Sequence, residues 1–120
     1  MQLRFLYLLL FANISGYAQT VNTDSLWSVW QDESRPDTVR LKAIYDLAWD
    51  GYLNSHPDST FYYAQLQFEF AQRKNQREYM AKALNAQGVS YQVRGEFPEA
   101  LAYSQRSLEI HEEDGDKSGV

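Results

Sequence analysis

The sequence contains no cysteine, and it has only three prolines and six glycines among 120 residues. The chain therefore forms no disulfides or thiolate metal sites and has no cysteine nucleophile. Its formal net charge of −5 offers no attraction to a phosphate backbone, which excludes nucleic-acid binding by counterion release as a primary role. Hydrophobic residues make up 44% and aromatic residues 15%, as in a folded protein. With so few helix breakers, this composition favours long helices.

Long hydrophobic runs are also scarce, and the longest lies at residues 5–12. Arg4 precedes it, and Gly16-Tyr17-Ala18 places small residues at the two positions that a signal peptidase reads. A membrane anchor would need about 20 apolar residues, more than this run provides. The sequence thus predicts a cleavable signal peptide over residues 1–18 and no membrane span. The mature protein is expected in the periplasm or outside the cell, or on the outer side of a membrane-anchored parent protein.

After residue 19, hydrophobic residues recur every three or four positions, which predicts amphipathic helices. Five helices are expected, at about residues 24–35, 37–53, 58–74, 77–94 and 98–113. Asp24 is expected to cap the first helix, and Asp58 or Ser59 the third. Gly95 is expected to end the fourth helix in a left-handed conformation. A turn is expected at residues 114–116.

Residues 41–80 align with residues 81–120 after a shift of 40 positions without a gap. The identical pairs are Lys42/Lys82, Ala43/Ala83, Tyr63/Tyr103, Gln65/Gln105 and Glu69/Glu109. Many other pairs keep their size class, among them Ala48/Gly88, Phe61/Leu101 and Phe68/Leu108. Small residues recur where two helices must touch, and large residues recur where a hairpin buries its face. The pattern indicates a helical repeat.

The second unit resembles a tetratricopeptide repeat (TPR), a family of helical hairpins whose pattern is W-x2-L-G-x2-Y, A-x3-F and P. The repeat signature is matched by Leu84, Gly88, Tyr91 and Ala100. Gly88 and Ala100 are small enough to let the two helices of one hairpin pack closely. The departures from the pattern are Gln87, Ser104 and Glu112.

The first unit matches the TPR pattern less well. Ile44, Leu47, Ala48 and Thr60 fit the pattern, but Gly51 replaces the tyrosine, and Gln67 stands where a small residue is expected. The 40-residue spacing also exceeds the family's usual period of about 34 residues. The first unit is therefore identified mainly by its register with the second.

The resemblance implies an all-α fold of antiparallel helix-hairpin repeats, a TPR-like α-solenoid preceded by the signal peptide. Residues 19–36 would form a short helix and linker, and residues 37–76 the degenerate repeat. Residues 77–120 would form the second repeat and the start of a link to a third. Because about three repeats are needed for a stable stack, further repeats are expected beyond Val120.

The family's geometry places the first helix of each repeat on a concave face that binds proteins or peptide segments. The residues expected on this face are Lys42, Tyr45, Trp49, Tyr52, Lys82, Asn85, Val89 and Gln92. The alternative is that Trp49 and Tyr52 merely pack against a neighbouring helix. The Lys-and-Asn clamp of some family members is not reproduced, because its positions hold Tyr45 and Trp49, then Asn85 and Val89.

No residue pattern predicts a catalytic, cofactor-binding or metal site. Asp46 and Asp50 lie one helical turn apart, but neither a histidine nor a third acid stands at ligand spacing. The expected function is an exported, non-catalytic protein-interaction module. One alternative is an enzyme with an unrecognised helical site, such as a glycoside-cleaving enzyme with two opposed carboxylates. Another is the sensor region of a signalling protein that continues into a histidine kinase, nucleotide cyclase or DNA-binding domain.

Overall fold

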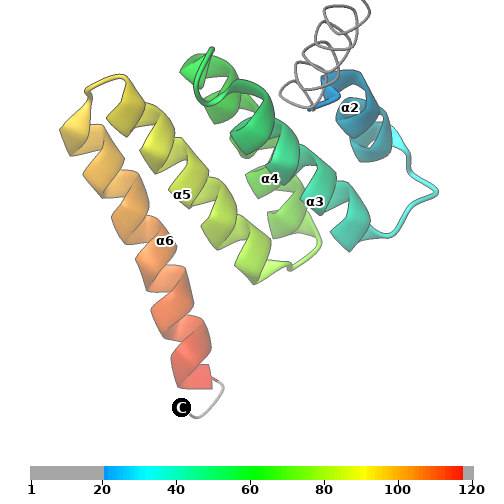
Figure 1. Ribbon diagram of the computed structural model, residues 1–120. Helices are drawn as coiled ribbons and strands as arrows, with labels where there is room; N and C mark the ends of the chain where they lie inside the picture. The colour runs from blue at the N-terminus through cyan, green and yellow to red at the C-terminus, as the bar shows by residue number, and fades with distance from the viewer. Residues whose placement is uncertain (1–20, 118–120) are drawn as a thin grey trace, which may run out of the picture.

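The computed structural model describes residues 21–117, which form helices and contain no strand. The elements are α2 (Thr23–Gln31), α3 (Asp37–Asp46), its π-helical continuation η1 (Leu47–Tyr52), α4 (Pro57–Arg73), α5 (Arg77–Val93) and α6 (Phe97–Lys117). Figure 1 shows them ranged from α2 at one end to α6 at the other. The prediction of an all-α fold is confirmed. The predicted signal peptide lies outside the described residues.

Membrane crossing requires a long, strongly apolar helix, and none of the helices between residues 21 and 117 meets that requirement.

The first helix is capped by a residue that the sequence did not single out. Asn22 is the N-cap of α2, and its Oδ1 accepts a hydrogen bond from the Ser25 amide at 3.0 Å. The prediction that Asp24 caps this helix is therefore wrong. Asp24 instead lies in the first turn, where a negative charge is favourable near the positive end of the helix dipole.

Replacing Asn22 with alanine is expected to destabilise the protein by about 1 kcal/mol, because the Ser25 amide loses its partner. Urea unfolding followed by circular dichroism measures the change. Asn54→Ala is the control, since Asn54 is exposed in the turn before α4 and caps no helix. Equal stability losses in the two variants would contradict the assigned cap.

The start of α4 also differs from the prediction. Pro57 occupies the first turn, and no side chain caps the helix. The predicted caps at Asp58 or Ser59 are wrong because Pro57, which has no N–H to satisfy, begins the helix before either residue. Asp58 instead accepts a hydrogen bond from Arg94 at the end of α5, at 2.6 Å.

Two tight turns have the same backbone geometry. Asn75, between α4 and α5, has φ of 54°, and Gly95, between α5 and α6, has φ of 80°. The backbone amide of the residue that follows each turn residue donates a hydrogen bond back into the preceding helix. The Gln76 amide donates to the Ala71 carbonyl at 2.8 Å, and the Glu96 amide donates to the Tyr91 carbonyl at 2.9 Å. This is the usual left-handed ending of an α-helix. The prediction for Gly95 is confirmed.

The predicted turn at residues 114–116 is wrong, because α6 continues to Lys117. Its last turns are held against the start of α5. Arg77 Nε donates to Asp114 at 2.7 Å, and its terminal nitrogen donates to Glu113 at 2.6 Å. The Asp114 carboxylate is the main reason that the pKa of Arg77 is raised. These contacts keep helical a segment whose local sequence favours a turn.

The core consists of two clusters between the helices. Leu41, Phe70 and Ala71 form one cluster, with Trp30, Tyr79 and Met80 packed against it. Ala64, Ala83 and Ala86 form the other, with Trp49 and Phe68 at its edge. Alanines in the second cluster let α4 and α5 approach closely.

Close helix contact also depends on small residues within each hairpin. A Cβ atom at Gly88 would lie 3.2 Å from the Ala100 carbonyl oxygen and 2.9 Å from Ser104 Oγ. In the first hairpin, the Thr60 hydroxyl donates to the Ala48 carbonyl at 2.8 Å, and both residues are buried. The expectation that Gly88 and Ala100 let two helices meet is confirmed.

Candidate functional site

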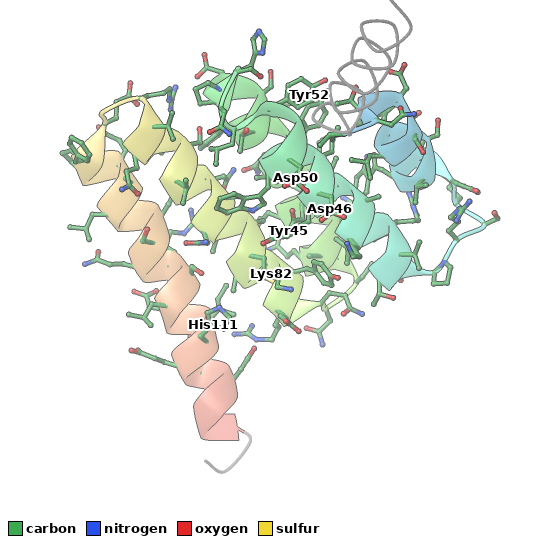
Figure 2. The ribbon with its side chains drawn as sticks, in the orientation of Figure 1. Tyr45, Asp46, Asp50, Tyr52, Lys82 and His111 are labelled. Carbon is green, nitrogen blue, oxygen red and sulfur yellow. The ribbon has the colours of Figure 1, made fainter. Side chains whose placement is uncertain are left out.

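Side chains from three helices line one open cavity of about 250 Å³. The lining residues that face solvent or are half-buried are Tyr45, Lys82, Asn85, Ser104, Leu108 and His111. We call this surface the Tyr45–His111 face. Figure 2 shows Tyr45 of α3, Lys82 of α5 and His111 of α6 following one another across the molecule. The cavity is the strongest candidate site on the expected concave side.

Lys82 occupies the centre of this face. Its Nζ lies 5.5 Å from the centre of the Tyr45 ring and 5.0 Å from that of Tyr79, within cation–π range. The Glu78 carboxylate lies 3.3 Å from the same nitrogen. These neighbours hold the ammonium group in place, but the pair with Glu78 is exposed and weak enough for a ligand to compete.

The polar groups beside Lys82 differ in their availability. Between residues 21 and 117, no hydrogen bond occupies the Asn85 side-chain amide, which therefore offers both a donor and an acceptor. Ser107 is buried, and its hydroxyl already donates to the Ala81 carbonyl at 2.8 Å. Leu108 is 55% exposed and supplies an apolar contact. The face thus combines hydrogen-bonding groups with uncovered apolar surface.

Lys42 lies on α3 beside this face but not in the cavity. It is exposed, and its Nζ donates to Asp46 at 2.7 Å. The hydrogen bond from the ammonium group to Asp46 raises the pKa of Lys42. Asp46, one of the two acids singled out in the sequence, is thus paired with a lysine, whereas Asp50 is exposed.

Trp49 belongs to the core more than to the open face. Its ring packs against Ala64, Ala83 and Ala86, and its Nε1 is buried without a hydrogen-bond partner among the described residues. The centre of its ring lies 6.2 Å from that of Tyr45. Trp49 therefore packs against neighbouring helices, as the alternative describes, and it does not line the cavity.

Tyr52 lies apart from the face, because residues 47–52 form a π-helix and not the expected α-helix. A π-helix turns fewer degrees per residue, so side chains at its end are rotated away from their α-helical positions. Gly51, a poor helix former, lies inside this segment. Tyr52 stacks on Tyr63 of α4, with ring centres 5.2 Å apart. Burial is the main cause of the raised pKa of Tyr63, and its hydrogen bond with Tyr52 adds to it.

Of the eight residues expected on the concave face, the cavity brings together Tyr45, Lys82 and Asn85. Val89 is half-buried and Gln92 exposed farther along α5, outside the cavity lining. The sequence interpretation missed the contribution of α6. The spacing of Ser104, Leu108 and His111 could have indicated this contribution, because it places the three residues on one side of a helix.

The described residues contain no group of three or more histidine, aspartate or glutamate side chains that could hold a metal ion. The cavity lining offers an ammonium group, an amide, hydroxyl groups and an imidazole around one leucine. Such a surface suits binding through hydrogen bonds and apolar contact.

Comparisons of the chain with protein-family models, with curated proteins and with solved structures gave no match. The resemblance to tetratricopeptide repeats therefore stays an expectation from the repeat signature in the sequence.

Proposed function

We propose that this chain is an exported protein-interaction module of the tetratricopeptide-repeat type, which binds a helical segment of another protein on the Tyr45–His111 face. The observation that carries the proposal is a correspondence within the chain. The exposed side of α6 matches, in the 40-residue register, the side of α4 that α5 covers.

The helix boundaries support the 40-residue register. The first helices of the two hairpins begin at equivalent positions, α3 at Asp37 and α5 at Arg77. The second helices do the same, since α4 begins at Pro57 and α6 at Phe97. The tight contacts within the hairpins also correspond, because Ala48 meets Thr60 in the first and Gly88 meets Ala100 in the second. Two copies of one repeated hairpin would produce this agreement.

The same register relates the α6 surface to a surface that is already covered. Phe68 of α4 is half-buried against Ala83 and Ala86 of α5. Its counterpart on α6 is Leu108, which is 55% exposed. Phe61 contacts Tyr91 of α5, with ring centres 5.3 Å apart, whereas its counterpart Leu101 is 60% exposed. A helix seated on α6 as α5 sits on α4 would cover both leucines.

The ligand's chemistry follows from the way α5 contacts α4. That contact uses alanines at positions 83 and 86 and the Ser90 hydroxyl, which donates to the Pro57 carbonyl at 2.7 Å. We therefore expect a helix with small side chains toward α6 and hydrogen-bonding groups toward Lys82 and Asn85. The first helix of a further repeat and a helix of a partner protein share these features.

The test uses a fluorescent, covalently stapled helical peptide with the sequence of residues 77–93, because a free peptide of that length is only marginally helical. Binding to the full chain is followed by fluorescence anisotropy. Leu108→Asp is expected to weaken binding on the order of tenfold or more, because it places a charge in the apolar contact.

The matched control is Tyr62→Asp, which changes another exposed hydrophobic residue, on α4 and outside the cavity. It should bind the peptide as the unchanged chain does. Unchanged binding in the Leu108→Asp variant would contradict the proposal. It would mean that the peptide binds elsewhere on the chain, for example by replacing the chain's own α5. No measurable binding would also contradict it.

Export rests on residues 1–18, and mass analysis of the N-terminus from the native host tests it. A mature protein that begins at Gln19 supports the proposal, and an intact Met1 opposes it.

A further inference from the structure

Three basic side chains gather around one aromatic ring between α3 and α4, outside the Tyr45–His111 face. Arg40 of α3 places its guanidinium carbon 4.7 Å from the centre of the Phe70 ring. Arg73 and Lys74, at the end of α4, place their guanidinium carbon and Nζ each 5.7 Å from the same centre. The three positive charges therefore all lie within 5.7 Å of the centre of the Phe70 ring.

These charges lack the partners that most other basic side chains have. Among the described residues, Arg35, Lys42, Arg77, Lys82 and Arg94 each form an ion pair with a carboxylate. Within the same part of the chain, Arg40, Arg73 and Lys74 form none. In a protein with a net charge of −5, the basic groups around Phe70 thus have no carboxylate within ion-pair distance among the described residues.

The three side chains border an open cavity of about 670 Å³ between the end of α2, the start of α3 and the end of α4. Trp30 and Phe70 form its apolar part. The acids that also line the cavity are Glu33 and Asp37, so three positive charges stand against two negative ones. The cavity is larger than a bare ion needs and has a positive balance.

The hydrogen-bond donors in this cavity are largely unused. Arg40 Nε donates to the Trp30 carbonyl at 2.8 Å, which fixes the guanidinium group and leaves its two terminal nitrogens. Over residues 21–117, the side chains of Arg73 and Lys74 donate to no protein group. Guanidinium and ammonium groups are the donors by which proteins bind phosphate and carboxylate.

Helix stability alone does not account for this arrangement. Positive charges are favourable at the C-terminal end of a helix, which would explain Arg73 and Lys74. Arg40, however, comes from the first turns of α3, where that effect opposes a positive charge. Its guanidinium carbon also lies 5.5 Å from the centre of the Trp30 ring, so it faces the same cavity.

We propose that this cavity binds a small organic anion with at least two negative charges, of the phosphate monoester or polycarboxylate class. The two anion types share the oxyanion groups that Arg40, Arg73 and Lys74 recognise, and their carbon skeleton would lie against Trp30. The site is separate from the Tyr45–His111 face and does not depend on the function proposed for that face.

The experiment titrates the full chain with glycerol 3-phosphate and, separately, with citrate. Calorimetry gives the affinity, and backbone amide NMR shifts locate the site. We expect saturable shifts at residues 30–40 and 70–74 with at least one anion, and the tighter of the two identifies the ligand class. Arg73→Gln combined with Lys74→Gln is expected to weaken binding at least tenfold, because two charge-assisted donors are lost.

Two further variants make the test specific. Arg106→Gln is the matched control, because Arg106 also lies over aromatic rings, those of Phe68 and Tyr103, but outside this cavity. It should leave the affinity unchanged. Glu33→Gln removes an opposing charge and should tighten binding severalfold, a gain that a folding defect cannot produce.

The proposal is overturned if neither anion produces saturable shifts, or if the shifts lie elsewhere. It also fails if Arg106→Gln lowers the affinity as much as the double variant. Because Arg73 and Lys74 are exposed, the double variant should keep the circular dichroism spectrum of the unchanged chain. If that spectrum is lost, Glu33→Gln still decides the matter, since an unchanged affinity in that variant contradicts the proposed site.

Discussion

Leu41→Ala is expected to destabilise the protein by about 3 to 4 kcal/mol, because the truncation leaves a cavity in the core. Leu41 is fully buried and contacts Phe70 and Ala71 of α4. Trp30 of α2 and Tyr79 of α5 pack against the same cluster. The cavity would therefore lie where four helices meet, and no single helix can move to fill it.

Urea unfolding measures this loss. A domain of this size is stable by only about 5–15 kcal/mol, so the variant should have a much lower urea midpoint or be partly unfolded without urea. Leu101→Ala is the control, because it removes the same atoms from a side chain that is 60% exposed. It should change the stability by no more than about 0.5 kcal/mol. Similar losses in the two variants would contradict the assigned core.

Gly88→Val is expected to cost about 2 to 3 kcal/mol through overpacking between α5 and α6. The new Cβ would lie 3.2 Å from the Ala100 carbonyl oxygen, a backbone atom that moves only if α6 moves. Valine has a better helix propensity than glycine, so local helix formation would favour the variant. A measured loss of stability therefore reports the contact between the helices.

The control for Gly88→Val is Ala102→Val, at an exposed position on α6. It should cost only about 0.5 kcal/mol, the difference in helix propensity. Adding Ser104→Ala to Gly88→Val should recover part of the loss, since Ser104 Oγ would lie 2.9 Å from the new Cβ. A Gly88→Val variant as stable as the unchanged chain would show that the helices are not in close contact.

The helices themselves could largely be predicted, because hydrophobic spacing and breakers are local signals. The fourth expected helix, residues 77–94, differs from α5 by one residue, and Gly95 ends it as predicted. The end of α6 could not be predicted in this way. Asp114 is held by Arg77, which is distant in the chain, and that pairing overrides the turn signal around Gly115.

The residues of the candidate face could be predicted only in part. Tyr45 and Lys82 lie together as expected, because both positions follow from regular helices. Tyr52 lies away from the face because residues 47–52 form a π-helix, which no sequence pattern predicted. The burial of Trp49 depends on Ala83 and Ala86, whose small size matters only once α5 lies beside it.

The one-sided packing of α6 has a consequence for local unfolding. α5 lies between α4 and α6, whereas α6 contacts only α5 over most of its length. Detaching α6 alone would leave the cluster around Leu41 intact, so this opening costs less than global unfolding. In its last turns, α6 is held by partly exposed ion pairs to Arg77, which salt weakens. Amide protons of α6 should therefore exchange with solvent through a partial opening that leaves those of α3 and α4 protected.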